Sequence, residues 1–348
     1  MRIWILLLTV SISTNVAAQC DFITANYIKE IINPSYVKSI NVEVLKSKKF
    51  AKNSLKIFAS KTKTIPPKFK KKFKALIKVE YSFGYCLYKA KIRQSGNAKD
   101  HIDLIGGKAL QSLDVQLLDG NILNATKFKL LISKTRNGRH EILASLILRE
   151  LDFISPETFE VNVDLNGSKS VMIFQEKATK ELLERRSRRE GPIFKGDQQL
   201  LWSNQNYGDF ELYPLALSRL VNDKWFNKGF TSQKIVLESF RRLQKVYLDY
   251  KYKYHVLDEY NSNIFFPNFE TSKIFSNYHI VLLAMNGQHA IAPAQRQYYF
   301  NSIQGTFEPI YYDGNVSFSS WSKNKYGLFQ NPPSNDFVIS ALKLVESD

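Results

Sequence analysis

Apolar and polar residues alternate over several short segments of the chain, as they do in strands that bury one face. In the segment 79–85, apolar side chains occupy every second position. The turn sequences Asp119-Gly120-Asn121 and Asn166-Gly167 follow two other segments of this kind. The pattern therefore predicts strands at residues 79–92, 112–118, 127–132, 159–165, 171–174, 298–302 and 308–312.

Apolar residues at helical spacing predict helices, mostly in the second half of the chain. Between Arg139 and Leu151, the apolar residues form one stripe along a helix. The charged segment 177–189 is predicted to be a helix that stops before Gly191-Pro192, and the segment 231–250 is predicted to be a long helix. A buried apolar segment is expected at 280–284. With strands first and helices concentrated later, the chain belongs to the α+β class.

The first residues have the three parts of a secretory signal peptide. Arg2 precedes an apolar run, 3–16, and Val16-Ala17-Ala18 supplies small residues for cleavage after Ala18. An uncleaved anchor is the alternative, but the run is shorter than the roughly 20 residues of a membrane span. We therefore predict a signal peptide at 1–18 and export to the periplasm, the cell surface or the medium. No second long apolar stretch follows, so no transmembrane span is expected after cleavage.

Export bears on the two cysteines, Cys20 and Cys86. In an oxidising compartment they can form one disulfide, and only one pairing exists. Otherwise Cys86 is a small apolar residue of a strand. A content of 44% hydrophobic residues is that of a globular chain with a core.

The net charge of +17 is concentrated in one segment. From Lys46 to Lys78 there are 13 lysines and no acidic residue, with Pro66-Pro67 as a break. Such a stretch attracts polyanions, although the interleaved apolar residues also fit an ordinary solvated face over a buried one. Export and the absence of a nucleic-acid motif argue against DNA or RNA as the partner. We expect residues 19–78 to be a basic lead-in to a domain at 79–348.

Four stretches, in this order, resemble segments of the CotH family, the spore-coat-protein-like atypical kinases. They are Lys91-Ile92-Arg93-Gln94-Ser95-Gly96-Asn97 with Asp100-His101; Glu141 and Leu148-Arg149-Glu150-Leu151 leading to Ser155-Pro156; Phe174-Gln175-Glu176-Lys177 followed by 180–184 and 188–193; and Phe307-Glu308-Pro309-Ile310-Tyr311-Tyr312-Asp313-Gly314-Asn315. The resemblance covers roughly residues 80 to 320.

The resemblance implies a distant protein-kinase-like fold, with a strand-rich part first and a helix-rich part later. It also implies ATP and Mg²⁺ or Mn²⁺ as cofactors, a protein substrate, and transfer of the γ-phosphoryl group to a hydroxyl. That chemistry needs a carboxylate on the metal, a cation on the phosphates and a carboxylate that orients the attacking hydroxyl.

The resemblance assigns roles to five residues. Asp313 is the candidate metal ligand, because a carboxylate at a strand end before a glycine can point into a cleft; the alternative is a turn aspartate. Arg93 and Lys195, near Gly96 and Gly196, are candidate phosphate-binding cations, or surface residues of a basic chain. Glu141 is the candidate partner of a phosphate-binding cation, and Glu176 is a candidate ion-pair or metal-facing carboxylate in the cleft. The alternative for each is an acid in the first turn of a helix.

The chain departs from the family pattern at two places. Gln116 stands where a kinase-like fold carries its lysine, and the loop 286–295 contains no acid. In that loop, His289 is the candidate proton acceptor or a hydrogen-bonded loop histidine, and Gln295 is a weak candidate metal ligand. Catalytic activity is thus left open between a divergent kinase and a pseudokinase. The contrasting hypothesis is a non-enzymatic envelope or surface assembly protein that binds an anionic glycan through its Lys-rich segment.

Overall fold

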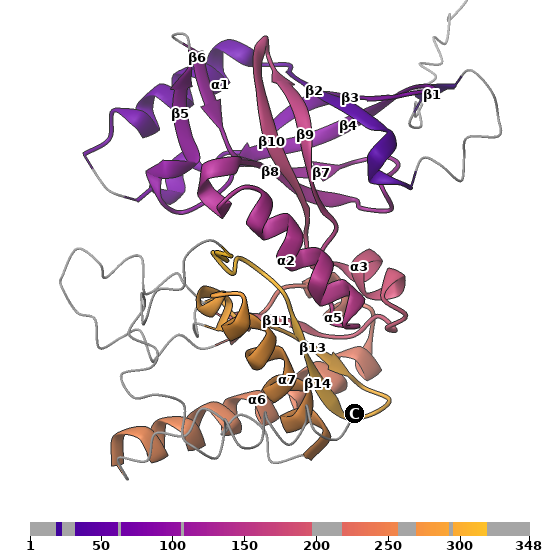
Figure 1. Cartoon of the computed structure of the whole chain (residues 1–348), viewed down its shortest axis with the longest axis vertical. Coiled ribbons are helices and arrows are strands. Elements are labelled where there is room, and N and C mark those ends of the chain that lie inside the picture. Colours follow the sequence, from indigo (N-terminus) through magenta and orange to yellow (C-terminus); the bar gives the residue numbers. More distant parts are fainter. Residues whose placement is uncertain are drawn as a thin grey trace, which may run out of the picture.

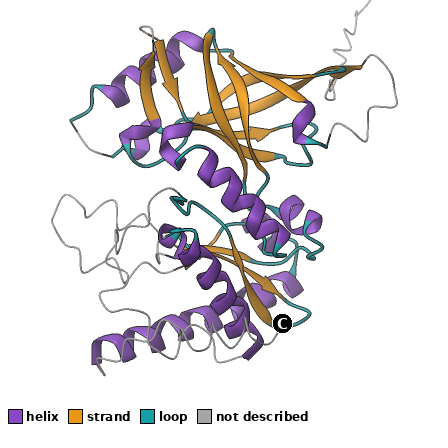
Figure 2. Ribbon diagram, viewed as in Figure 1, coloured by secondary structure: helices purple, strands orange, loops and turns teal. Residues whose placement is uncertain are grey.

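The computed structural model describes residues 19–22, 32–61, 64–105, 108–196, 218–256, 269–291 and 295–318. The predicted signal peptide, 1–18, lies outside these residues. In the described part, strands gather in the first half of the chain and the longest helices in the second (Figure 2).

A closed barrel forms the N-terminal half (Figure 1). Its seven strands run in the order β4-β3-β2-β9-β10-β8-β7, and β7 pairs back to β4. All neighbours are antiparallel except β2 and β9. The strands are β2 (Val37–Val44), β3 (Phe73–Tyr81), β4 (Gly84–Gln94), β7 (Leu113–Leu117), β8 (Lys127–Ile132), β9 (Thr158–Leu165) and β10 (Ser168–Glu176).

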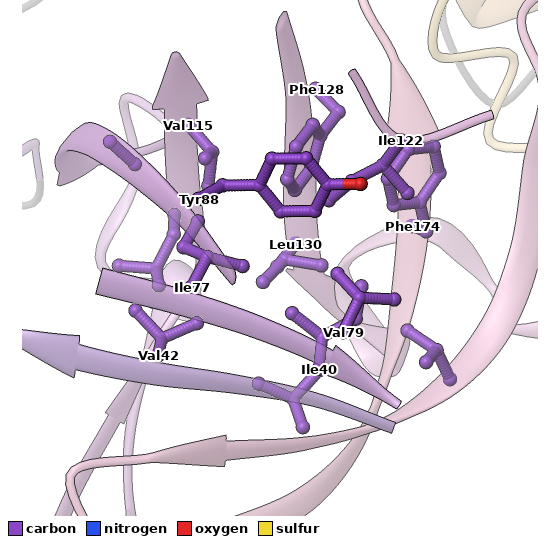
Figure 3. Packing of buried hydrophobic residues seen from close by; sticks show 14 of the residues in the cluster. Ile40, Val42, Ile77, Val79, Tyr88, Val115, Ile122, Phe128, Leu130 and Phe174 are labelled. Carbon is purple, nitrogen blue, oxygen red and sulfur yellow. The ribbon is translucent and has the colours of Figure 1, made fainter. Parts of the chain in front are cut away.

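The interior of the barrel is filled by apolar side chains from every strand (Figure 3). Because side chains alternate between the two faces of a strand, one residue in two points inwards. Aromatic rings fill one part of this core: Phe174 stacks on Phe128 and on Phe159, with ring centroids 4.6 and 4.7 Å apart. The α1 helix (Ser47–Phe58) adds Phe50 to the same core.

Two additions lie at the edges of the barrel. The β1 strand (Gln19–Phe22) pairs with the first residues of β4, and a disulfide joins Cys20 to Cys86 there. The β5 (Ile102–Ile105) and β6 (Lys108–Gln111) strands form a separate hairpin. Before it, Gly96 has φ +82° and lies against the His101 ring so closely that a Cβ would be 1.9 Å from that ring. The glycine turn of the first resemblance stretch therefore has a packing reason.

The second half is a small antiparallel sheet with helices packed against it (Figure 1). Its order is β12-β11-β13-β14, made of β12 (Ser218–Leu220), β11 (Ile193–Gly196), β13 (Gln297–Asn301) and β14 (Thr306–Ile310). The helices of this half are α3 (Lys180–Arg185), α5 (Asp223–Phe226), α6 (Phe230–Val256) and α7 (Phe269–Ala284), while α2 (Arg139–Glu150) links the halves. None of the helices in the described residues is long and apolar enough to cross a membrane.

The prediction of a distant protein-kinase-like fold is wrong, because the strands close into a barrel and do not form a kinase-like pair of lobes. Alternation along each strand is the same in an open sheet and in a closed one, so it carries no information about closure. The proposed domain boundary at residue 78 falls inside β3. The segment expected to be a lead-in supplies α1 and two barrel strands.

Most local predictions agree with the structure. The predicted strands at 127–132 and 159–165 and the predicted helices at 139–151 and 231–250 are confirmed, with small shifts at their ends. The segment 79–92, predicted to be one strand, belongs to β3 and β4 and the turn between them. The helix predicted at 177–189 is confined to α3.

Candidate anion-binding site

A row of polar side chains crosses the outer face of the barrel. Arg93 on β4 lies opposite Asp114 on β7, Asp114 lies opposite Lys129 on β8, and Lys129 lies opposite Gln175 on β10. Their immediate neighbours in sequence are buried, and most of them are apolar residues of the barrel core, namely Ile92, Leu113, Val115, Phe128, Leu130 and Phe174. Alternation therefore points this row outwards, where the second half of the chain covers it.

Asp114 holds two of the surrounding cations. Arg93 Nη2 lies 2.7 Å and Lys177 Nζ lies 2.9 Å from its carboxylate oxygens. Burial alone raises the pKa of a carboxyl group, but Lys177, Arg93 and Lys129 outweigh that effect and hold the pKa of Asp114 well below its ordinary range. Asp114 is therefore ionised and already occupied by its own partners.

Tyr312, two residues after β14, brings the second half of the chain to this row. Lys129 Nζ donates to its hydroxyl oxygen, and Lys195 Nζ lies 4.0 Å from the centre of its ring. Arg136 Nη2 lies 3.5 Å from the same hydroxyl. Burial raises the pKa of a phenol, but Lys129, Lys195 and Arg136 outweigh it and lower the pKa of Tyr312 to about 7. The phenol thus lies in a basic environment that favours its ionised form.

Asp313 follows directly and has φ +54°, a left-handed conformation that few non-glycine residues adopt. Its Oδ1 lies 3.1 Å from Arg136 Nη1, and its Oδ2 lies 3.6 Å from His289 Nε2. Burial raises the pKa of Asp313, but Arg136 and His289 outweigh it and keep the pKa well below the ordinary range. Both oxygens of this carboxylate therefore face cationic or proton-donating groups.

Glu141, on the first turn of α2, is fully buried beneath Asp313 and Arg136. It accepts hydrogen bonds from Tyr311 Oη (2.7 Å) and Gln175 Nε2 (3.0 Å). Burial, together with the nearby charge of Asp313, raises its pKa to about 7. Glu141 thus connects α2, β10 and the end of β14 through hydrogen bonds.

The raised pKa of Glu141 predicts a pH-dependent stability. Between its ordinary value of 4.5 and about 7, the folded chain retains a proton that the unfolded chain has released. Glu141 therefore contributes stability that is complete below pH 4.5 and is lost as the pH rises through 7. We expect the Glu141→Gln variant to lack this loss, on the order of 1–3 kcal/mol.

Urea unfolding of both proteins across this pH range checks the prediction. His101 and His279, whose pKa values burial lowers to about 3, make stability rise with pH over part of the same range. They are present in both proteins, so the difference between the two curves isolates Glu141. Parallel curves would contradict a protonated Glu141 in the native state.

Positive groups outnumber negative ones in the site. Three carboxylates are present, those of Asp114, Asp313 and Glu141, and the surrounding cations are Lys70, Arg93, Lys129, Arg136, Lys177 and Lys195. Burial and the neighbouring cations lower the pKa values of Lys70 and Lys195 to about 8. We refer to these six cations as the basic cluster.

Two members of the basic cluster have groups that could still bind an anion. Arg136 is 5% exposed, and its Nε has no hydrogen-bond partner among the described residues. The ammonium group of Lys195 faces the ring of Tyr312, and no carboxylate in the described part of the chain pairs with it. Arg136 is paired with Asp313, but its Nε and the ammonium group of Lys195 are polar groups that a ligand with negative charge could engage. The arrangement therefore suits an anion.

The structure brings most of the sequence-predicted residues together. Arg93, Lys195, Asp313, His289 and Glu141 all lie in or next to the basic cluster. Two predicted residues lie outside it. Glu176 points to the face of β10 opposite Gln175 and pairs with Arg185, whereas Gln295 lies in the turn before β13 and takes no part in the contacts described above.

Sequence reasoning missed Asp114, Lys129, Arg136, Lys177 and Tyr312. For the strand residues, the available signal was the alignment of charged residues across neighbouring strands. A single charged residue on the outward face of a strand is ordinary, but a row of them is not. Reading that signal requires the strand order, which local pattern does not contain. Gln116, on β7, lies opposite Lys91 and Lys127, two residues away from the row.

The donor set gives little support to a divalent metal. Mg²⁺ and Ca²⁺ prefer several free oxygen ligands, but Asp313 is paired with Arg136, and Glu141 is engaged with Tyr311 and Gln175. Among the described residues, no group of three or more His, Cys, Asp or Glu side chains is placed to hold a metal ion. The surroundings of Asp313 fit an anion better than a cation, and binding of Mg²⁺ or Mn²⁺ stays a prediction.

Comparison with known proteins does not identify the chain. No family model matches it, and no curated protein matches it. The fold and the site define a barrel protein with a basic cluster where its second half meets the outer face of the barrel. The resemblance to the CotH family stays a prediction as far as function is concerned.

Proposed function

We propose that this protein binds a multiply charged anion in the basic cluster, and specifically the phosphate groups of a nucleotide such as ATP. The observation that carries the proposal is the excess of six buried or partly buried cations over three carboxylates. In the described residues, Lys195 pairs with no carboxylate and Arg136 Nε has no hydrogen-bond partner. Phosphate oxygens accept several charge-assisted hydrogen bonds at once, which matches donors that converge from different strands.

Binding is proposed here without phosphoryl transfer. Transfer needs a carboxylate that is available to orient a hydroxyl group. Asp114 is paired with Arg93 and Lys177, and Asp313 with Arg136, while the pKa of Glu141 is raised to about 7 by burial. His289 Nε2 lies 3.6 Å from Asp313 Oδ2.

The proposal predicts that the Lys195→Met variant loses ligand binding while keeping its fold. The Lys195 ammonium has no carboxylate partner in the described residues, and burial lowers its pKa to about 8, so its charge is unfavourable in the free protein. The variant is therefore expected to be at least as stable as the natural protein without ligand. With ATP at about 100 times Kd, the natural protein gains about 2.7 kcal/mol, which raises its Tm by several degrees, and the variant gains little.

Thermal unfolding with ATP, ADP and pyrophosphate, each with and without Mg²⁺, measures these effects. Lys91→Met is the matched control, because Lys91 lies on the same strand and face as Arg93 but is exposed. The control should respond to ATP as the natural protein does. Absence of any shift with all three compounds, or an equal shift in Lys195→Met, would rule out the proposed site.

A further inference from the structure

The α1 helix presents an unusual face to solvent. Phe50, Ser54 and Ile57 point into the protein. The opposite side carries lysines at 48, 49, 52 and 56 beside the apolar residues Leu55 and Phe58. Leu55 is 56% exposed and Phe58 is 52% exposed, although both side chains are large and apolar. On a helical wheel, the exposed arc is thus half basic and half apolar.

The lysines in the first turn of α1 lie where the helix dipole disfavours positive charge. Its first turn contains lysines and no acid, and no side chain caps its N-terminus. Cations near the positive end of the helix dipole are unfavourable. Among the described residues, no carboxylate pairs with the lysines of this helix. An external anion that neutralises these lysines would remove the repulsion.

The basic surface continues beyond the helix. The segment 46–78 contains no acidic residue. Most of its lysines are exposed, namely Lys46, Lys48, Lys49, Lys52, Lys56, Lys61, Lys68, Lys71, Lys72 and Lys74. By contrast, Lys70 belongs to the basic cluster. The exposed lysines are therefore a second basic feature, separate in role from the candidate anion-binding site.

We propose that α1 rests on an anionic membrane surface. Its lysines would contact lipid phosphate groups, while Leu55 and Phe58 enter the boundary between headgroups and acyl chains. Interfacial helices combine these two kinds of residue, and their binding depends on both apolar area and charge. A soluble anionic polymer would account for the lysines but not for the two large exposed apolar side chains beside them. In Figure 1, α1 lies on the side of the barrel away from the C-terminal half.

Sedimentation of the full mature chain with lipid vesicles tests the proposal. We expect binding to vesicles of phosphatidylcholine containing phosphatidylglycerol, and little binding to vesicles of phosphatidylcholine alone. The Leu55→Ser/Phe58→Ser variant and the K48Q/K49Q/K52Q/K56Q variant should each lose at least about tenfold in binding to the anionic vesicles. All six side chains are exposed, so the fold should persist, which thermal unfolding without vesicles verifies.

A control with the same loss of charge is K91Q/K169Q/K224Q/K234Q, whose lysines are exposed but lie outside the segment 46–78. It should bind the anionic vesicles nearly as well as the natural protein. The proposal is overturned if the control loses as much binding as the α1 variant. It is also overturned if the Leu55→Ser/Phe58→Ser variant binds vesicles and heparin as the natural protein does, because the partner is then a general polyanion such as a glycan. The response to ATP is independent of these outcomes.

Discussion

Replacing Arg136 with methionine is expected to lower the free energy of unfolding by about 3–5 kcal/mol. The guanidinium group of Arg136 is 3.1 Å from Asp313, and the side chains of the pair are only 6% and 13% exposed. Without Arg136, the charge of Asp313 stays buried beside Glu141, which raises the pKa values of both carboxyl groups. The loss arises from the uncompensated charge and exceeds the net contribution of the pair itself.

Urea unfolding of three variants tests this interpretation. The double variant Arg136→Met/Asp313→Asn should recover part of the loss, since it removes both charges. Arg139→Met is the matched control: its side chain is 86% exposed and pairs with Glu160 at 3.1 Å, so its removal should cost less than about 1 kcal/mol. If the single Arg136 variant were as stable as the control, the buried ion pair would not exist in solution.

Phe174→Ala is expected to destabilise the barrel by about 3–5 kcal/mol. Phe174 is fully buried on β10, and its ring stacks on Phe128 of β8 and on Phe159 of β9. Truncation therefore leaves a cavity where three neighbouring strands meet. The strands are held by backbone hydrogen bonds on both sides, so the cavity cannot collapse easily.

Val171→Ala on the same strand is the control. Val171 is 50% exposed, so its truncation should lower the free energy of unfolding by well under about 1 kcal/mol. Thermal and urea unfolding provide both values. Similar losses for the two variants would mean that Phe174 does not lie in a closed core.

The strands and helices could be predicted well from the sequence, because their periods are local properties. The helix 139–150 shows this: its apolar stripe and its charged first residues appear within a dozen positions. The predicted strand at 79–92 failed for a local reason too, because the turn between Tyr81 and Gly84 contains Phe83, a buried apolar residue that continues the alternation. The alternation of apolar and polar residues therefore does not reveal the turn.

The candidate site could be predicted only in part. The resemblance singled out Asp313, as a metal ligand, and the structure pairs it with Arg136 and places it near His289. Lys129 could not be recognised, because a lysine between apolar residues on a strand is also typical of an ordinary solvated face. Its role depends on Tyr312, which is 183 positions away in the sequence and whose hydroxyl oxygen accepts the hydrogen bond of Lys129.

By itself the sequence determined the local elements, the presence of two cysteines that can pair, the concentration of lysines in 46–78, and an expectation of export. These properties depend on neighbouring residues or on composition. The tertiary structure alone decided that β7 returns to β4 and closes the barrel, which excludes the kinase-like fold. It also decided that Arg93, Lys129, Lys195 and Asp313 share one environment. Strand pairing and burial are non-local: they join residues far apart in the chain, and no period or spacing encodes which strand a given strand will meet.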